Sequence, residues 1–460
     1  MGKKTTKGKK KSVRDPYGLP VIRTHVGAAD LGSRFHMVCI PTGEDRQQTL
    51  RSFGTTTPQL QKLVDWLNSE KIESLAMEST YLYWIPLYEM LERAGIEAVL
   101  VNARHVRNVP GCKTDPKDSR WLQLLHSVGL LKGSFRPGPE ICQWRALTRQ
   151  SGKLVEARTR AVQWMQKSLD QMNIAVHRAV TDLTGVTGLS IIRAIVAGER
   201  DPLVLARLRD KRCRKSEAEI AEYLQGTWFE EHLFNLERAL EDFDHYERQI
   251  VRYEVEIQRV IEKITPDERE DQTAPQHPKA DKQKAMKRRG EECLRQLLWR
   301  FSGVDLTRID GIRASAAQTI LSELGLDLSS FPNEDHFVSW LRICPPSHTS
   351  AGKRVKKPNG NGSSRLSAVF RMAALSVRHA DCSLGARYRR MARRKSAKTA
   401  VLEGARTIAK LVFRMLRYGQ DYVDEGVTAY ENRFQQRRLK GLINTAEQMG
   451  YVLVPKENAA

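Results

Sequence analysis

The order of the strand-like and helix-like segments in residues 21–130 constrains the fold more than any other feature. Two strand-like segments joined by a short turn come first, which predicts a hairpin, and a third strand-like segment is expected at the sheet's other side. Helical and strand-like periodicities then alternate, a pattern typical of an α/β domain. The predicted elements are strands at 24–30, 34–40, 48–56, 72–77 and 97–102 and helices at 57–71, 83–95 and from 115 onward.

Four carboxylates occupy the ends of these elements. Asp30 ends the first strand, Glu78 follows the strand at 72–77, and Asp115 and Asp118 begin the last helix on one helical face. Hard divalent cations take oxygen ligands, and four close carboxylates repel one another without a cation. The set therefore predicts a metal site. Taken singly, each acid is also an ordinary turn residue, and Asp115 is placed to cap a helix ahead of Pro116.

The composition indicates a polyanionic partner. The 460-residue chain carries a formal charge of +22, with 76 Lys and Arg against 54 Asp and Glu. Its 40% hydrophobic content is enough for more than one core. The head MGKKTTKGKKKSVR predicts a disordered basic arm over residues 1–20, which either contacts nucleic acid or is simply solvated.

The cysteines exclude two classes of small extracellular or metal-bound domain. Seven of them are scattered along the chain without a Cys-x-x-Cys pair, which argues against a disulfide framework and a zinc ribbon. The sequence also has no apolar run of about 18 residues, so no membrane partner is expected. These features predict a reducing, cytoplasmic setting.

Residues 143–264 have a helical pattern. The first part places Arg145, Arg149, Arg158 and Arg160 beside a repeating apolar face. Such arginines either follow phosphates or form a solvated face.

Farther along, apolar residues from Leu233 to Ile264 step by three and four, with one extra step of three, which predicts a coiled-coil seam with a stammer. The seam serves either dimerisation or an antiparallel helix pair within the chain. Residues 265–292 contain no Leu, Ile, Val or aromatic residue and predict a flexible linker or an RNA-responsive insertion.

The remaining domain, residues 293–426, precedes a predicted tail at 427–460. A turn at 310–312 between two helical segments looks like a helix-hairpin-helix, whose exposed amides suit a phosphate. From 342 to 417 there are nineteen Lys and Arg but two acidic residues, which predicts a phosphodiester partner. Ser350 lies in this stretch within TSAGK; by composition alone it is most simply a turn serine.

The acidic motif carries a family resemblance. The run VNARHVRNVPGCKTDPKDSRWLQLL, with AMEST upstream, resembles the DEDD-type transposases of bacterial insertion sequences, the insertion-sequence-one-ten family. The first domain of that family is similar to the RuvC Holliday-junction resolvase, a ribonuclease-H-like fold whose four acids hold Mg²⁺. The resemblance gives that role to Asp30, Glu78, Asp115 and Asp118.

A second motif lies in the C-terminal region. WLRICPPSHTSAGK resembles the family segment whose serine attacks DNA covalently, and it departs from that segment at Arg342 and Ala351. The resemblance makes Ser350 the nucleophile, with Ser347 and Thr349 as lesser candidates. The residues expected to contact nucleic acid are Lys353, Arg354, Lys356, Lys357, Arg365, Arg104 and Lys113.

The resemblance implies an α/β plus α fold: a RuvC-like domain at 21–130, a helical coiled-coil middle and a mostly helical transposase domain with a helix-hairpin-helix-like element. It also implies a site-specific recombinase that moves its own insertion sequence. The partners would be double-stranded target and donor DNA, a structured non-coding bridge RNA, and further copies in a homodimer or homotetramer. The expected location is the bacterial cytoplasm, at the nucleoid.

Two other functions remain open from the sequence. A resolvase-like nuclease would use the acids and water alone, leaving Ser350 as a loop residue. A non-catalytic RNA-binding scaffold would keep the basic surface and tolerate loss of the acids. Loss or survival of activity in Ser350→Ala and Asp115→Ala distinguishes these three.

Overall fold

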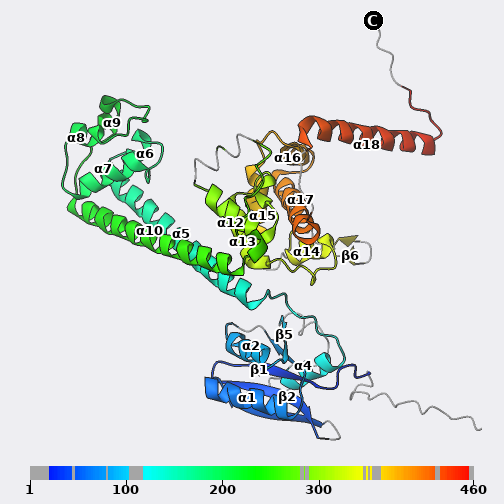
Figure 1. Ribbon diagram of the computed structural model, residues 1–460. Coiled ribbons are helices and arrows are strands. Elements are labelled where there is room, and N and C mark those ends of the chain that lie inside the picture. The colour runs from blue at the N-terminus through cyan, green and yellow to red at the C-terminus, as the bar shows by residue number, and fades with distance from the viewer. Residues whose placement is uncertain are drawn as a thin grey trace, which may run out of the picture. The chain divides into compact units, whose positions relative to one another are not determined.

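The structure of the chain is a computed structural model (Figure 1). It describes residues 20–43, 47–78, 81–102, 118–279, 284, 290–344, 349–350, 353–354, 364–419 and 425–454. The chain divides into two units, the first ending at Arg136 and the second beginning at Pro137.

Unit 1 contains a five-stranded mixed sheet in the order β3-β2-β1-β4-β5. The first three strands pair antiparallel, and β4 and β5 continue the sheet parallel to β1. The strands are β1 (Val26–Leu31), β2 (Phe35–Thr42), β3 (Gln47–Gly54), β4 (Ser74–Glu78) and β5 (Glu97–Val101), and the helices are α1 (Thr57–Ser69), α2 (Trp84–Arg93) and α4 (Asp118–Ser127). The predicted order of elements is confirmed, and the sheet is consistent with a ribonuclease-H-like domain.

Helices cover both faces of this sheet because side chains alternate along each strand. Ala29 and Met77 belong to the core formed with α1 and α2, together with Leu63 and Leu87. The residues one position earlier, Ala28 and Ala76, face the opposite way and pack with Leu122 of α4. Alanine at both positions leaves room for a helix to lie close to the sheet.

Helix α4 runs opposite in direction to β1. The backbone amides of Ile22 and Arg23 both donate to the carbonyl of Ser127 at the end of α4, at 2.9 Å. Near the same end, His126 Nδ1 donates to the carbonyl of Gly27 at 3.0 Å, and Nε2 accepts from Ser74 Oγ at 3.2 Å. The end of α4 thus lies beside the amino ends of β1 and β4, so its beginning lies toward their carboxyl ends.

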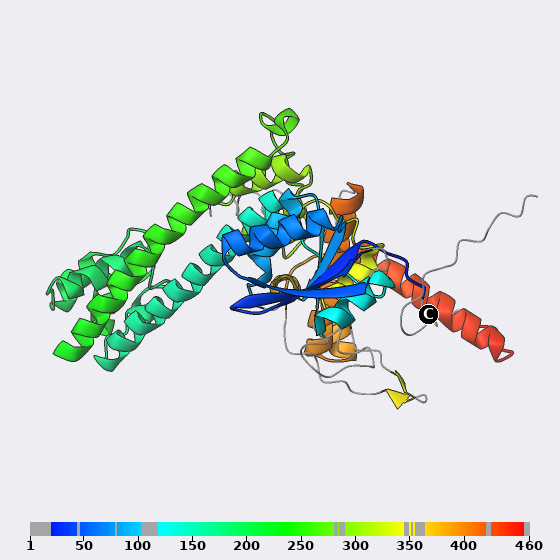
Figure 2. The same cartoon turned by 90° about the horizontal axis from the view of Figure 1, so that it is seen from below.

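Unit 2 is built on two long helices, α5 (Pro139–Gln171) and α10 (Glu230–Ile264), which lie side by side in Figures 1 and 2. The pair is antiparallel, because the amide of Thr227, just before α10, donates to the carbonyl of Met172 at the end of α5, whereas Arg158 pairs with Glu247 farther along. Most of the predicted seam on α10 is buried. Packing within one chain accounts for the N-terminal part of the seam, from Leu233 to Tyr246. Dimerisation through the seam stays a prediction.

A small cap of short helices lies at the end of the pair where α5 finishes and α10 begins (Figure 1). Its helices are α6 (Val176–Ala179), α7 (Val186–Val196), α8 (Pro202–Arg207) and α9 (Glu217–Tyr223). They share one apolar cluster with both long helices, through residues such as Met165, Ile191, Leu205 and Phe243. The cap is therefore a packed part of unit 2.

In the described residues, the rest of unit 2 is helical apart from two short strands. Its helices are α12 (Glu292–Ser302), α13 (Ala314–Leu324), α14 (Glu334–Trp340), α15 (Arg365–Ser376), α16 (Ser383–Arg394), α17 (Ala397–Tyr418) and α18 (Gly426–Gln448). Phe337 of α14 lies against the rings of Phe370 and Phe413, from α15 and α17. Helix α18 occupies the predicted tail, and none of its residues is buried.

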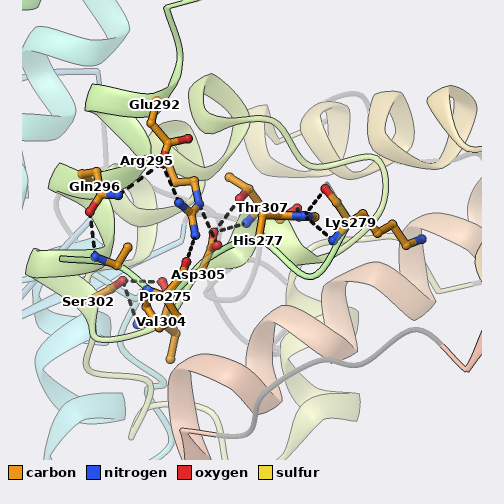
Figure 3. A network of polar contacts seen from close by, with 11 residues as sticks. Pro275, His277, Lys279, Glu292, Arg295, Gln296, Ser302, Val304, Asp305 and Thr307 are labelled. Atoms are coloured by element: carbon orange, nitrogen blue, oxygen red, sulfur yellow. Dashed lines mark hydrogen bonds and ion pairs between the residues drawn. The ribbon is translucent and has the colours of Figure 1, made fainter. Parts of the chain in front are cut away.

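Residues 265–279 differ from the flexible linker predicted for 265–292. His277 and Ala274 are buried, and the carbonyl of Pro275 accepts from Arg295, whose guanidinium also pairs with Asp305 at 2.8 Å (Figure 3). The segment is held by polar contacts, which the absence of apolar residues does not exclude. Residues 280–283 and 285–289 of the predicted linker lie outside the described residues.

The turn predicted to expose its amides, at 310–312, is instead packed. Ile309 and Ile312 are buried. Gly311 has φ 94°, and a Cβ there would lie 2.5 Å from the carbonyl oxygen of Ala373 on α15. Helix α15 covers the turn. The packing therefore does not support the prediction that the turn exposes its amides to a phosphate, as a helix-hairpin-helix would.

We predict that unit 1 loses stability as the pH falls below 6.5, partly through His126. Burial lowers the pKa of His126 below its ordinary value of 6.5, so the unfolded chain takes up a proton that the folded chain does not. His126→Gln should therefore show a smaller fall in the free energy of unfolding between neutral and mildly acidic pH, measured by urea denaturation. His25→Gln, at a partly exposed histidine of the same unit, is the control. An undiminished pH dependence in His126→Gln would contradict the assignment.

We also predict that Asp305→Ala destabilises the C-terminal helices by about 3–5 kcal/mol, because it leaves the buried Arg295 without its most buried carboxylate partner. Asp305→Asn should cost less, since the amide oxygen still accepts from the amide of Thr307. Glu270→Ala, at an exposed position of the neighbouring segment, is the control. Urea midpoints are the measurement, and equal midpoints for Asp305→Ala and Glu270→Ala would contradict the prediction.

Candidate active site

Asp30 and Glu78 stand at neighbouring strand ends. Ala29 of β1 is in register with Met77 of β4, and the two strands are parallel, so the next residue on each strand is one of these acids. Ala29 and Met77 face α1 and α2. By alternation both acids belong to the other face, which α4 covers. The structure thus brings two of the four predicted acids to one point.

The start of α4 reaches the same level of the sheet. Leu122 packs on Ala28 and Ala76, and Asp118 begins the helix one turn earlier. One turn from 122 to 118 advances about 6 Å, and the step from Ala28 to Asp30 advances about 6.6 Å in the same direction. The backbone at Asp118 therefore lies near the two strand-end acids. Asp115, Arg104 and Lys113 lie outside the described residues.

Asp30 and Glu78 offer only oxygen donors at this edge. Cys39, in register with Ala28 beneath α4, is fully buried, and burial raises the pKa of its thiol to about 12. His36 is in register with Leu31 and so lies on the opposite face; burial lowers its pKa. Neither is a metal-binding thiolate or a proton donor beside the acids. A donor set of carboxylates fits a hard divalent cation.

The described residues alone do not complete a metal site. Among them, no group of three or more His, Cys, Asp or Glu side chains is placed to hold a metal ion. Asp30 and Glu78 supply two carboxylates, and the side chains of the other two predicted acids are not among those described. Carboxylate chemistry and backbone position are thus the features that favour a metal ion here.

A cavity beside this sheet lies elsewhere on the described part of unit 1. It encloses about 210 Å³ and is lined by Arg23, Glu97 and His126, among others. Arg23 precedes β1 and Glu97 begins β5, so the cavity is at the amino ends of the strands. The candidate acids are at the carboxyl ends and do not line it.

Ser350 lies in a two-stranded hairpin of unit 2. Strands β6 (Thr349–Ser350) and β7 (Lys353–Arg354) pair antiparallel, with the backbone of Ser350 directly opposite that of Lys353. Only positions 351 and 352 separate the strands, which is the length of a tight β-turn. The pairing of the two strands holds the backbone of a candidate nucleophile beside that of a basic residue. Ser347, Lys356 and Lys357 lie outside the described residues.

Arg365, predicted to contact nucleic acid, has a partner inside the chain. It is the first residue of α15, and its guanidinium donates to the carbonyl of Thr148 on α5 at 3.4 Å. A Cβ on Gly152 would lie 2.3 Å from that guanidinium, so a larger residue at 152 would make the Arg365 side chain shift. Arg365 therefore joins α15 to α5, and its contact with nucleic acid stays a prediction.

The arginines of α5 mostly form ion pairs within the chain, which the sequence did not indicate. Arg149 donates to both carboxylate oxygens of Glu323 on α13, at 2.8 and 2.7 Å, which raises the pKa of the arginine further. Arg145 lies 3.3 Å from the same carboxylate, and Arg158 pairs with Glu247. Three of the four arginines expected to be solvated or to follow phosphates are thus bound within the chain.

The chain matches two family models. Residues 28–174 match a transposase model, that of the DEDD transposases of IS110, and residues 304–389 match the transposase model of the IS116/IS110/IS902 family. No curated protein gives a match. The first match spans Asp30, Glu78, Asp115 and Asp118, and the second spans Ser350.

Fold, acids and matches together define a transposase, an enzyme that acts on DNA. Within that class, the chain belongs to the IS110 family of insertion-sequence transposases, the insertion-sequence-one-ten family that the motifs resemble. DEDD transposases are typically metal-dependent. No helix among the described residues is long and apolar enough to cross a membrane.

We predict that Asp30→Asn and Glu78→Gln each lower DNA strand cleavage at least about 100-fold, because loss of a metal ligand should exceed the 10–100-fold effect of losing a residue behind one. Each variant should stay folded, since removing a charge relieves carboxylate repulsion. Divalent cations should raise the Tm of the wild type more than that of either variant. Asp65→Asn, at an exposed acid on α1, is the control. Full cleavage by Glu78→Gln would exclude that acid from the site.

Proposed function

We propose that this transposase is a site-specific recombinase, guided by a structured bridge RNA, that cuts and exchanges DNA strands through a Mg²⁺-dependent acid site and a covalent phosphoserine intermediate. The observation that carries the proposal is the approach of Asp30, Glu78 and the start of α4 at one edge of the sheet. Transposition by the IS110 family supplies the DNA substrate.

The residues proposed to hold the cation are Asp30, Glu78, Asp115 and Asp118. When bound, Mg²⁺ would polarise the scissile phosphate and stabilise negative charge that develops on its oxygens. The chain's own contribution is to keep carboxylates of two adjacent strands and one helix end on a common face. Without a cation that arrangement is repulsive, which is the physical reason to expect one.

Ser350 is proposed to attack the scissile phosphorus. Its Oγ forms a bond to phosphorus, the bond from phosphorus to the 3′ oxygen breaks, and the 3′ oxygen takes up a proton while the seryl hydroxyl loses one. The products are a 5′-phosphoserine link and a free 3′-hydroxyl. That hydroxyl can reverse the reaction on another strand, so exchange needs no ATP. Lys353, opposite Ser350 in the hairpin, adds positive charge beside the reacting phosphate.

Bridge RNA is proposed to choose the DNA sites. Base pairing would then read the sequence, while the protein contacts phosphate and duplex shape, as in other RNA-guided systems. The excess of cations in the C-terminal region supports a backbone contact of this kind. A homodimer or homotetramer is part of the proposal, because exchange joins target and donor strands.

The second candidate is a metal-dependent nuclease that uses water instead of Ser350. It is favoured by one observation, that all four predicted acids belong to unit 1, whereas Ser350 belongs to unit 2. In this case Ser350→Ala would cleave DNA as the wild type does. An RNA-binding scaffold without catalysis is excluded by the family's activity.

We predict a covalent protein–DNA adduct on denaturing gels when wild-type protein is mixed with target DNA, RNA from the element's flanks and Mg²⁺. Ser350→Ala and Asp115→Ala should each abolish it, because one removes the nucleophile and the other a metal ligand. Ser315→Ala, at an exposed serine of α13, is the matched control and should form the adduct.

Three further outcomes of this experiment are informative. Cleavage without an adduct that persists in Ser350→Ala would replace the recombinase mechanism by the nuclease. An adduct lost in Thr349→Ala or Ser347→Ala but kept in Ser350→Ala would move the nucleophile. An adduct formed equally without RNA would remove the guiding role of RNA and leave the serine chemistry intact.

A further inference from the structure

The loop between α8 and α9 concentrates positive charge at the outer end of the long helix pair. Six of the nine residues from Arg207 to Lys215 are Lys or Arg, and one is acidic. The loop belongs to the cap of short helices, remote from the C-terminal helices, which contact the other end of the pair. Neither the acid site nor the serine hairpin accounts for it.

Two of these cations are used to build the loop. The guanidinium of Arg209 donates to the carbonyls of Cys213 and Lys215, at 3.3 and 3.2 Å. The ammonium of Lys215 donates to the carbonyl of Arg178 and lies 4.2 Å from the centroid of the Tyr223 ring. These contacts fix the loop against α6 and α9.

A third contact fixes the loop to α7. The amide of Asp210 donates to the hydroxyl of Thr187 at 2.9 Å. Ser216, at the end of the loop, caps α9 in a reciprocal capping box with Glu219. The loop is therefore held at both ends and at its centre, so its remaining side chains have a fixed base.

Four of the six cations are left outside: Arg207, the last residue of α8, and Lys211, Arg212 and Arg214 of the loop, with Arg178 next to them on α6. All five of these side chains are exposed. Arg212 pairs with Asp210 inside the loop, which lowers the pKa of that carboxyl to about 2, but its own side chain remains 85% exposed. For Lys211, Arg214 and Arg178, no ion pair with an acidic side chain occurs among the described residues.

The neighbouring acids do not neutralise this surface, because they have other partners. Glu217 lies 3.6 Å from Arg209, and Glu219 is taken up by the capping box. Asp244 of α10 accepts two bonds from Arg193 of α7, at 2.8 and 2.6 Å. Helix α10 itself carries ten acidic and five basic residues, so this helix repels a polyanion. The loop stands out as a separate cationic surface.

We propose that the α8–α9 loop, through Lys211, Arg212 and Arg214 with Arg178 beside them, binds the phosphate backbone of double-stranded DNA. Exposed cations on a rigid base are suited to phosphate contacts that position a duplex without reading its sequence. The 35 residues of α10 extend about 52 Å, roughly fifteen base pairs of duplex. The inference rests on the family's DNA substrate and is independent of the serine chemistry and of RNA guidance.

The test compares full-length wild type with Lys211→Ala/Arg212→Ala/Arg214→Ala by fluorescence anisotropy on a labelled duplex of about 30 base pairs over a salt series. Affinity at low salt should fall at least about tenfold. The slope of log K against log salt should become shallower by about 0.9 for each phosphate that the variant no longer neutralises. Equal slopes would overturn the proposal.

Matched variants separate the loop from general charge effects. Arg248→Ala/Arg252→Ala/Arg259→Ala removes the same charge from exposed positions of the acidic helix α10 and should bind DNA as the wild type does. Lys211→Arg/Arg214→Lys keeps the charge and should also bind normally, because the charge and not the identity of each side chain is needed. Equal urea midpoints for the loop triple variant and the wild type show that the loop variant is folded. If both triple variants weaken binding equally, the loop has no special role and the proposal fails.

Two further comparisons complete the test. The first distinguishes DNA from RNA as the source of phosphate, and the second separates the loop proposal from the serine mechanism. If the loop variant loses affinity for structured RNA alone, with DNA binding unchanged, the DNA assignment is overturned. Ser350→Ala should bind duplex DNA with wild-type slope while forming no adduct. Failure of the loop proposal would thus appear in the salt slope, and failure of the serine mechanism would appear in the adduct.

Discussion

The parallel pairing of β1 with β4 is the contact on which the arrangement of unit 1 depends. Its register puts Ala29 beside Met77, so that the following residues, Asp30 and Glu78, stand next to each other on the opposite face. If one strand slipped by one residue, its acid would face the apolar core under α1 and α2, and an apolar residue would take its place on the α4 face. The same face receives α4 through Leu122. The strand register that buries the core therefore also places Asp30 beside Glu78.

Much of unit 1 could be predicted because its signals are local. Each strand and helix shows its own periodicity, and Asp30 and Glu78 lie near the ends of their strands. Both the order of elements and the approach of Asp30 to Glu78 could therefore be predicted. Ser350 is a candidate nucleophile through a motif alone, whereas its register opposite Lys353 is visible only in the structure. Local patterns do not reveal contacts between residues that are far apart in the sequence. The structure of unit 2 depends on such contacts.

Two examples show the limit in physical terms. Arg149 pairs with Glu323, a residue 174 positions away, so no periodicity could tell a structural arginine from a phosphate contact. Residues 265–279 have almost no apolar surface to bury, yet Arg295, Asp305 and backbone carbonyls hold that segment in place. A rule that equates packing with apolar content fails wherever a buried guanidinium satisfies several oxygens at once.

The same reasoning changes what a charge of +22 means for nucleic-acid binding. A cation that already shares a hydrogen-bonded carboxylate, as Arg149 does, would have to give up that partner before contacting a phosphate, and the buried Glu323 would be left unpaired. A cation such as Lys211 loses only water. The surface that attracts DNA is therefore set by where carboxylates are missing, and the α8–α9 loop differs from α5 in this respect although both are rich in arginine.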